Sequence, residues 1–421
     1  MSAFRPSLRL ALARDSHTFA RRLPGKLLVA TVLGAIPTAL MLRSMVGGSY
    51  INDSWIAALA AVLVIAGYAL SRRLLFTVLV TVLVLSIVTV IAIPQVASAR
   101  SGDHTLLEFD PTDGQLADYR DLAVAVIDVD AAEPVRFSGL GADQTTPMEI
   151  GSLTKAMTGL MIADAVERGE ISLGAPVSSY IPELAGSQAG AVTMRELVTH
   201  TAGYVAFGPV TVARGFWAAP LGHNFFATDA SQLIDEARAG TLASRGTYVY
   251  STLGAAVAGL AVAEATGMSY AALMHTRLFE PLGMSNTAVE VDNNAVDGGW
   301  SASGLPVEPW ILGAYAPGGG VVSTAHDLAL FATALLDGTA PGLAAMDPLA
   351  SAGSDDTHVG IFWHISEWSP GEPVTWHTGQ TGGYATFFGI NRASRTAVIV
   401  LSDVSNPAVL HLGRDLLADI A

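Results

Sequence analysis

Residues 149–155 read Glu-Ile-Gly-Ser-Leu-Thr-Lys and open an apolar stretch with helical periodicity that runs from Leu153 to Arg168. Ser152 and Lys155 are three positions apart, so on a helix they share one face and the hydroxyl can meet the amine. A Ser in the first turn also lies where free backbone NH groups and the helix dipole favour negative charge. The spacing suits an activated nucleophile, although an ordinary Ser at a helix start followed by a solvated Lys has the same pattern.

The use of lysine in this chain bears on that choice. The sequence contains 20 arginines and only two lysines, Lys26 and Lys155. Arg therefore serves wherever a generic surface cation suffices. A Lys amine can lose its proton when it is desolvated, whereas an Arg guanidinium cannot. Lys155 is thus predicted to stand where a proton is exchanged.

Two later segments carry groups suited to the same chemistry. In Gly246–Gly254 an aromatic turn leads into a helix, and a Tyr phenol beside a Lys cation, such as Tyr250, can act as a base. A core Tyr at a helix entry is the alternative. In Trp376–Tyr384 a short strand is followed by a Gly-rich turn, where an acyl substrate can lie against backbone NH groups that form an oxyanion hole. His377 in this segment is a buried structural His or a ligand, and no partner spacing supports a metal.

The order of the remaining patterns indicates an α+β domain. Strands are predicted at Leu122–Val129, Val135–Leu140, Val374–Trp376, Tyr384–Ile390 and Ala397–Leu401. Helices are predicted at Leu153–Arg168, Ser231–Ala239, Leu253–Thr266, Tyr270–Leu278, Ala325–Leu336 and Pro407–Ile420. We therefore expect both ends of the domain to share one antiparallel sheet flanked by helices, with an inserted helical region and a cleft between the two layers.

Charge divides the chain unevenly. Up to Ala99 there are nine Lys or Arg against two acids, whereas residues 100–421 have 13 against 35, a balance of −22. A domain of that charge repels polyanions, so no nucleic-acid partner is expected. The absence of Cys rules out disulfides, thiolate metal sites and a Cys nucleophile. The ten His residues form no H-E-x-x-H or similar cluster, and neither a metal nor a cofactor is predicted.

Three apolar stretches precede the acidic part, at Leu27–Leu42, Trp55–Leu70 and Leu74–Ile93. The last is about 20 residues without a charge, which is the length that spans a bilayer core. Basic residues precede the first stretch and separate the second from the third, and the positive-inside rule places both basic sites in the cytoplasm. A multi-pass cell-membrane protein with an extracytoplasmic domain is therefore expected.

The predicted organisation has four parts: a cytoplasmic basic N-terminus (1–26), a transmembrane region of about three helices (27–93), a linker (94–118) and a single domain (119–421). One or two of the stretches lying in the membrane interface is one alternative. The other is a signal peptide that ends at Ala97-Ser98-Ala99 and releases the domain by cleavage after Ala99. Whether the third stretch is a retained anchor or a cleaved signal peptide, the same domain is exported.

In order along the chain, the three chemical segments resemble the S-x-x-K, Y-x-N and K-T-G or H-T-G motifs of the serine β-lactamase and penicillin-binding-protein (DD-peptidase) superfamily. The resemblance extends over nearly all of residues 120–421. Glu196–Gly203 is similar to the family's L-x-x-H-T-S-G segment, and Pro281–Met284 and Gly318–Thr324 resemble signatures of the class C branch. A β-lactamase-like fold is what this resemblance implies.

The resemblance also implies the roles of the site residues. Ser152 is the acylated nucleophile, Lys155 assists its deprotonation, and Tyr250 is the general base or a proton relay. His377 takes the cation position of the third motif. The implied oxyanion and substrate-binding groups are the backbone NH groups of Ser152 and Gln380, together with Thr252, Thr378 and Gly379. His200 is interpreted as structural, although a Ser-His hydrolase would use it.

One residue departs from the family pattern. Thr252 stands where the peptidases and β-lactamases have Asn, and a hydroxyl cannot offer two donors together with a carbonyl. This difference weakens the case for β-lactamase or DD-peptidase specificity and leaves esterase or amidase activity open. The expected function is hydrolysis through an acyl-enzyme of peptidoglycan stem peptides, D-amino-acid amides, small esters and, less readily, β-lactams. The alternative is an inactive sensor or scaffold that binds cell-wall fragments.

The segment from Val205 to Phe226 is rich in aromatic side chains. It includes Phe207, Phe216, Trp217 and Phe225. These rings either line the cleft or pack in the core, and core packing is expected for most of them.

Overall fold

The computed structural model describes residues 119–240, 242–289, 296–354, 356–369 and 371–420. The basic N-terminus, the three apolar stretches and the linker predicted for residues 1–118 lie outside this part of the chain. Within it, no single helix is both long and apolar enough to cross a membrane. Only the pair Thr252–Thr266 and Tyr270–Phe279, bent by 78° at its break, has the required length and composition when taken together.

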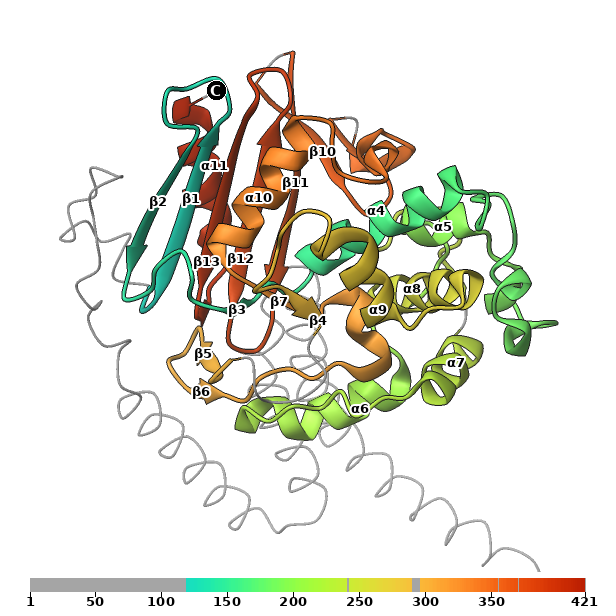
Figure 1. Ribbon diagram of the computed structural model, residues 1–421. Helices are drawn as coiled ribbons and strands as arrows, with labels where there is room; N and C mark the ends of the chain where they lie inside the picture. The colour runs from blue at the N-terminus through green and yellow to red at the C-terminus, as the bar shows by residue number, and fades with distance from the viewer. Residues whose placement is uncertain (1–118, 241, 290–295, 355, 370, 421) are drawn as a thin grey trace, which may run out of the picture. The chain divides into compact units, whose positions relative to one another are not determined.

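One antiparallel sheet of eight strands frames the domain (Figure 1), in the order β2-β1-β13-β12-β11-β10-β9-β8. The strands are β1 (Leu122–Asp128), β2 (Val135–Leu140), β8 (Ala350–Ser354), β9 (Thr357–Val359), β10 (His364–Ser369), β11 (Glu372–Gln380), β12 (Ala385–Asn391) and β13 (Thr396–Ser402). The first strand pairs with β13 along its whole length, from Leu122↔Ser402 to Asp128↔Thr396. The predicted sharing of one sheet by both ends of the domain is confirmed.

The two faces of this sheet are covered by different helices, α10 (Ala325–Leu336) on one face and α11 (Val409–Ile420) on the other (Figure 1). In β1 the odd-numbered residues from Ala123 to Ile127 belong to the larger core, and the even-numbered ones belong to a smaller core beneath α11. Successive side chains of a strand point to opposite faces. Every residue of β12 and β13 is therefore buried.

The region inserted into the sheet is mainly helical, as predicted. Its helices are α4 (Leu153–Glu167), α5 (Met194–Val198), α6 (Pro209–Ala218), α7 (Ala230–Ala239), α8 (Thr252–Thr266) and α9 (Tyr270–Met274), which continues into a π-helical turn, η6 (His275–Phe279). The predicted helices agree with these and with α10 and α11 to within two residues, whereas α5 and α6 were not predicted. Helix α4 is buried from Leu153 to Ala165, because a helix that is apolar on all sides must be surrounded by protein.

Short elements connect the helical region to the sheet. Two small sheets have the orders β3-β7-β4 and β14-β5-β6. Their strands are β3 (Met148–Glu149), β4 (Ala288–Val289), β5 (Gly299–Ser301), β6 (Pro306–Val307), β7 (Val321–Ser323) and β14 (Val404–Ser405). The 3-10 segments are η2 (Val177–Ser179), η3 (Pro182–Leu184), η4 (Ala189–Ala191), η5 (Ala219–Leu221), η7 (Gly313–Gly318) and η8 (Leu343–Met346). Ile150 N–H donates to Val321 O at 3.0 Å, which fixes the start of α4 beside β7 and η7.

Strand β11 is longer than the sequence indicated. The prediction ended the strand at Trp376 and placed the following residues in a Gly-rich turn, but the strand continues to Gln380. The reason is its pairing with β12, which runs in unbroken register from Val374↔Asn391 to Gln380↔Ala385. The third chemical segment therefore lies on a strand, and only the residues after Gln380 form the turn.

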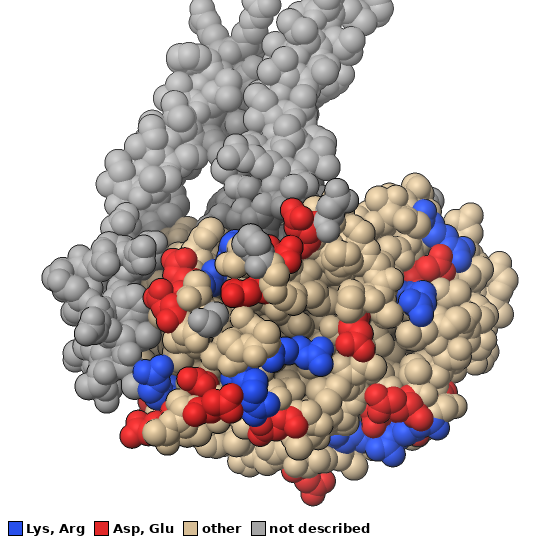
Figure 2. Space-filling model, turned by 90° about the horizontal axis from the view of Figure 1, so that it is seen from above, with Lys and Arg blue, Asp and Glu red and all other residues tan. Residues whose placement is uncertain are grey.

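Charged side chains of both signs are mixed on the face of the domain that is drawn in Figure 2. Figure 2 shows one face, on which Lys and Arg lie among Asp and Glu and do not gather into a continuous basic patch. Such a face provides no phosphate-binding stripe of the kind that nucleic-acid recognition requires.

Helix α8 and segment η7 approach each other at a glycine. A Cβ added at Gly259 would lie 2.1 Å from Pro317 Cβ, which is far inside the usual contact distance. Gly259→Ala should lower the free energy of unfolding by about 1–3 kcal/mol through overpacking, more than the gain of up to about 1 kcal/mol that Ala brings to a helix. Urea unfolding of the variant and the wild type measures this.

The matched control is Gly174→Ala, at an exposed turn where the nearest atom to an added Cβ is 3.9 Å away. It should leave the unfolding midpoint unchanged. An unfolding midpoint for Gly259→Ala as high as that of Gly174→Ala would contradict the close contact between α8 and η7.

Candidate active site

Ser152 and Lys155 meet at the first turn of α4. Ser152 precedes the helix with helical backbone angles (φ −64°, ψ −10°), and its side chain makes no capping hydrogen bond. Instead, Lys155 Nζ donates to Ser152 Oγ at 2.9 Å. The hydroxyl and the amine are therefore in direct contact, as the i, i+3 spacing predicts.

The amine of Lys155 is shielded from water. The residue has no exposed surface, and its Nζ also donates to the carbonyl of Gly318, the last residue of η7, at 2.5 Å. None of the ion pairs among the described residues includes Lys155. Burial disfavours the ammonium form and lowers the pKa of Lys155 to about 7. The amine can thus exchange a proton with a neighbouring hydroxyl near neutral pH.

Tyr250 is held against Lys155 by the segment that precedes α8. The next residue, Ser251, caps the helix: its Oγ accepts from Gly254 N–H at 2.8 Å and donates to Val205 O at 2.7 Å. On the other side of Tyr250, Val249 N–H donates to the carbonyl of His200 at 2.8 Å. The ring of Tyr250 consequently lies 4.9 Å from Lys155 Nζ, measured to the ring centroid.

Three imidazoles lie around the Tyr250 ring, of which those of His200 and His377 are buried and that of His364 is half-buried. Their centroids lie 4.6 Å (His200), 6.3 Å (His377) and 6.5 Å (His364) from its centroid. Burial, followed by the nearby positive charges, lowers the pKa of His364 to about 4 and that of His200 and His377 well below the ordinary value. All three rings are therefore neutral near pH 7.

The neutral rings have defined hydrogen-bonding roles. His377 Nδ1–H donates to the carbonyl of Thr378 at 2.6 Å, so its Nε2 is the acceptor nitrogen. His200 Nδ1 accepts from Ser251 N–H at 3.2 Å, which makes His200 a support for the Tyr250 segment. The sequence analysis gave His377 the cation position of the third motif. In the structure His377 has the predicted place, but its burial favours the uncharged form.

The backbones of the first and third segments touch through two glycines. A Cβ added at Gly151, where φ is +50°, would lie 2.7 Å from Gln380 N. A Cβ added at Gly379 would lie 1.9 Å from Ile150 O and 3.3 Å from Ser152 N. Only residues without side chains allow this approach. It brings together the two backbone nitrogens, of Ser152 and Gln380, that the sequence analysis assigned to the oxyanion hole.

Thr252 and the amine of Lys155 both lie close to Gly318. A Cβ added at Gly318 would lie 2.7 Å from Thr252 Cγ2 and 3.8 Å from Lys155 Nζ. Thr252 thus presents its methyl group to the surroundings of the amine, at the position where the family pattern has an amide. An apolar group there adds to the desolvation of the ammonium, whereas an amide oxygen would stabilise it.

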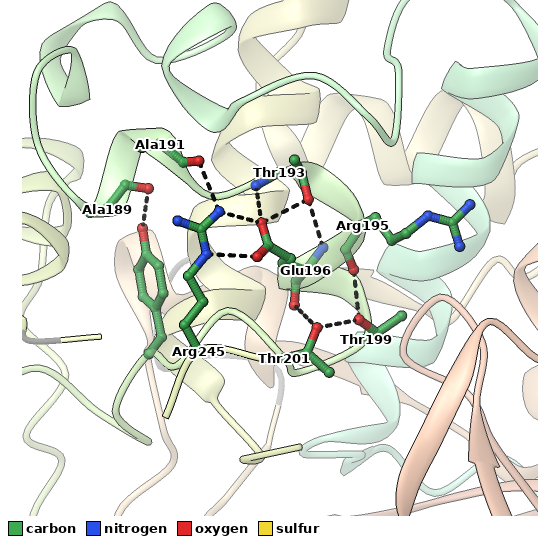
Figure 3. Close-up of polar contacts among 9 residues, drawn as sticks. Ala189, Ala191, Thr193, Arg195, Glu196, Thr199, Thr201 and Arg245 are labelled. Carbon is green, nitrogen blue, oxygen red and sulfur yellow. Dashed lines mark hydrogen bonds and ion pairs between the residues drawn. The ribbon is translucent and has the colours of Figure 1, made fainter. Parts of the chain in front are cut away.

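A salt bridge outside the site supports the loop that carries His200. Glu196 completes a capping box with Thr193 at the start of α5, and its carboxylate also accepts from Arg245 Nε at 2.7 Å and from Arg245 Nη2 at 2.8 Å (Figure 3). Beyond this pair, Gly246 N–H donates to Thr201 O at 2.7 Å. The loop of His200, which has a left-handed φ of 58°, is therefore joined to the segment of Tyr250.

The structure brings the four predicted catalytic residues, Ser152, Lys155, Tyr250 and His377, into one cluster. Thr252, Thr378, Gly379 and Gln380 lie at its border. Two contributors were missed by the sequence analysis, the Gly318 carbonyl and His364. His364 reaches the site because it pairs with Trp376 in the β10–β11 register, and its Nε2 contacts Tyr248 Oη at 2.8 Å. Gly318 begins a segment that the family resemblance had singled out without giving a role to its carbonyl, and sequence spacing gives no signal for His364.

In the described part of the chain, no group of three or more His, Cys, Asp or Glu could hold a metal ion.

The aromatic side chains between Val205 and Phe226 differ in their exposure to solvent. Phe225 stacks on Phe226 with centroids 4.3 Å apart, and Phe207 packs against Phe226 at 5.7 Å, whereas Trp217 is 70% exposed. Phe207 and Phe225 therefore pack against the core, as expected for most of these rings, and Trp217 is an exception.

Comparison with known proteins identifies the family of the chain. Residues 112–421 match the sequence profile of the β-lactamase family. A β-lactamase of Escherichia coli (strain K12) is 25% identical over 308 residues, covering 63% of this chain and 77% of that protein. Penicillin-binding protein 4 of Amycolatopsis lactamdurans is 26% identical over 315 residues, covering 68% of this chain and 80% of that protein.

Solved structures show the same fold. The crystal structure of a class C β-lactamase from Rhodobacter sphaeroides superposes with a TM-score of 0.60 at 22% identity, over 72% of this chain and 95% of that one. A β-lactamase from Sulfitobacter sp. EE-36 superposes with a TM-score of 0.59 at 21% identity, over 72% and 92%. Because the family profile covers most of the chain, this protein belongs to the β-lactamase family, and it is a serine hydrolase.

The Glu196–Arg245 pair yields a prediction about positioning. Arg245→Met should release the loop of His200 from the Tyr250 segment and lower kcat by roughly 10- to 100-fold, because small displacements of catalytic groups are costly. The matched control is Arg238→Met, which removes another surface arginine, one paired with the exposed Asp235. Steady-state kinetics on an ester substrate should separate the two variants, and equal kcat values would argue against a positioning role.

The burial of Lys155 yields a prediction about pH. Below a pKa of about 7 the amine is protonated and cannot accept the proton of Ser152, so kcat/KM should fall as pH decreases through 7. Thr252→Asn should move this limb to higher pH, because an amide oxygen stabilises the ammonium form. Profiles of p-nitrophenyl ester hydrolysis from pH 5 to 9 measure both. Superimposable limbs for wild type and variant would show that Thr252 does not tune the amine.

Proposed function

We propose that this protein is a membrane-anchored, extracytoplasmic serine hydrolase that cleaves uncharged esters or amides through an acyl-enzyme. The observation that carries the proposal is the 2.9 Å contact between Ser152 Oγ and the amine of Lys155. This amine is wholly buried, and burial lowers its pKa to about 7. A hydroxyl beside an amine of this kind can be deprotonated at neutral pH.

The proposed reaction has two steps. Ser152 Oγ attacks the substrate carbonyl while its proton passes to Lys155 or Tyr250, and the resulting oxyanion is held by the NH groups of Ser152 and Gln380. The tetrahedral intermediate collapses, the proton moves to the departing alkoxide or amine, and an ester to Ser152 remains. Water then attacks this ester, gives its proton to the same groups and regenerates the serine.

The charges of the site support an uncharged substrate. The third-motif residue, His377, is buried and its pKa is lowered, so it offers no fixed cation. Lys155 Nζ is already engaged by Ser152 and Gly318. A substrate carboxylate would find no permanent positive charge among these groups, and an unpaired charge is expensive to desolvate. Esters and neutral amides are therefore preferred over β-lactams and over peptidoglycan stem peptides that end in a free carboxylate.

Membrane anchoring is supported by the sequence alone. Three apolar stretches occur between Leu27 and Ile93, and the basic residues around them are distributed as the positive-inside rule requires for an exported domain. The proposed location is the cell membrane, with residues 119–421 on the extracytoplasmic side.

A substrate panel tests the catalytic proposal. Wild type and Ser152→Ala are offered p-nitrophenyl esters, D-amino-acid amides, D-alanyl-D-alanine peptides and nitrocefin. The wild type should hydrolyse the esters best, and Ser152→Ala should lose at least about 1,000-fold in kcat. A fluorophosphonate probe should label only the wild type.

The opposite results would have a definite meaning. Hydrolysis that persists in Ser152→Ala would remove Ser152 from the mechanism. A wild-type chain that takes no label and cleaves no substrate would instead indicate a non-catalytic scaffold of the same fold. Nitrocefin turnover faster than ester turnover would overturn the preference for uncharged substrates.

A further inference from the structure

The exposed apolar residues of the described domain are concentrated in one place. Its four exposed large hydrophobic residues are Val205, Val210, Trp217 and Leu221, all within 17 positions of one another. Isolated apolar residues are ordinary on a protein surface, whereas a group of them marks an interaction surface. Three of the four lie on α6 or on η5, the turn that follows it.

Helix α6 is attached to the domain by polar contacts. Thr211 is buried and is bound through its backbone and its hydroxyl to the buried carboxylate of Glu236, at 2.7 and 3.1 Å. Arg214, the charged residue of this helix, donates to Ala227 O at 2.7 Å and to Gln232 Oε1 at 3.0 Å. Gly215 packs on the ring of Phe225. The helix is therefore fastened to the domain by its polar groups.

The exposed residues of α6 are largely apolar, and Arg214 lies at the edge of the same helix face. Val210, Ala213 and Trp217 follow the i, i+3, i+7 spacing of one helix face, and Leu221 continues it through η5; we call these four residues the apolar stripe. Val210 is 44% exposed, Trp217 70% and Leu221 62%. A helix on the surface of a soluble domain ordinarily has polar and charged residues at its exposed positions.

The segment of sequence that carries the stripe contains no acids, although the exposed Glu308 accepts from Asn224 N–H at 2.9 Å beyond the end of the stripe. Between Glu196 and Asp229 there is no Asp or Glu, although residues 100–421 contain 35 acids and a segment of this length would average about three. Anionic lipid headgroups repel acidic surfaces, and an acid-free segment with an exposed Trp and Leu has the composition of a helix that lies in a membrane interface.

The anchor proposed for residues 27–93 would keep the domain close to a bilayer. The third apolar stretch ends at Ile93, and only the 25 residues 94–118 separate it from the domain. Even fully extended, this connection spans at most about 80–90 Å. A domain of about 300 residues has a radius of gyration near 19 Å, so the connection keeps it within roughly two of its own diameters of the bilayer surface.

We propose that the apolar stripe of α6 docks on the surface of the bilayer in which the chain is anchored. This inference rests on the membrane anchoring proposed above. Trp217 and Leu221 enter the interface between headgroups and acyl chains, while Thr211 and Arg214 keep the helix attached to the domain. Other occupants of the same surface, such as a second copy of the chain, are distinguished by the experiment below.

The absence of cysteine makes a direct test possible. Trp217→Cys and Leu221→Cys in the full chain each give a single site for an environment-sensitive fluorophore, and Ala132→Cys is the matched control. Ala132 is exposed in the turn between β1 and β2, beside Arg395, at the end of the sheet opposite Gln380. The proteins are reconstituted into vesicles of phosphatidylethanolamine and phosphatidylglycerol, with and without a nitroxide-labelled lipid.

Docking predicts a blue shift of the probes at 217 and 221 and loss of their fluorescence to the nitroxide lipid, with neither change at 132. Adding Ala213→Glu to the Leu221→Cys protein should reverse both changes, because a carboxylate is driven out of the interface. Probes at 217 and 221 that behave like the probe at 132 would overturn the inference. A blue shift without quenching by the nitroxide lipid would also overturn it, and would indicate a second copy or another segment of the chain on the stripe.

The same vesicles separate this inference from the proposals on which it stands. Extraction at alkaline pH that releases the chain overturns the anchoring and the docking together. A chain that stays in the vesicles while its stripe probes remain unquenched overturns the docking alone. Ester hydrolysis by the labelled proteins reports on the acyl-enzyme chemistry independently, since neither Trp217 nor Leu221 belongs to the catalytic cluster.

Discussion

The amine of Lys155 has to be kept from water at the point where three distant parts of the chain meet. Its contacts are Ser152 on its own helix, the Gly318 carbonyl at the end of η7 and the ring of Tyr250 before α8. A buried cation is costly unless it is hydrogen-bonded or gives up its proton. Helix α4 is buried over 13 residues, from Leu153 to Ala165, and therefore shields the amine of Lys155 from water. The fold therefore creates the basicity that the chemistry uses.

Close approach of backbones then fixes the geometry of the site. Glycines stand where α4 meets Ile361, where α8 meets Pro317 and where the Ser152 segment meets β11, and in each place a Cβ would fall within about 3 Å of its neighbour. Such contacts leave no room for side-chain adjustment, so the two candidate oxyanion nitrogens and the Gly318 carbonyl are positioned by main chain. The glycines of the sequence motifs are thus explained by packing as much as by turn geometry.

Local pattern was enough to predict the parts of the fold with strong periodicity and the residues that act within one helical turn. The limits of α10 and the pairing of both ends of the domain follow from alternation and apolar spacing, and so does the contact of Ser152 with Lys155. The position of His364 at the site depends on the register of β10 and β11, and the uncharged form of His377 depends on burial by distant segments. Neither strand register nor burial can be predicted from a short stretch of sequence. Helix α6 was not predicted, because the charged Arg214 interrupts the apolar spacing of Val210, Ala213 and Trp217 on one helix face.

The segment that carries the apolar stripe also supports the catalytic cluster. The Val205 carbonyl accepts from Ser251 Oγ, and the Ala206 carbonyl accepts from the backbone NH groups of Thr252 and Leu253 at 3.0 Å each. Helix α6 begins three residues later, so the surface proposed to dock on the bilayer and the segment that supports the cap before α8 are consecutive parts of one backbone. The proposed docking is consistent with the proposed preference for uncharged substrates, since neutral esters and amides enter a lipid interface more readily than carboxylates do.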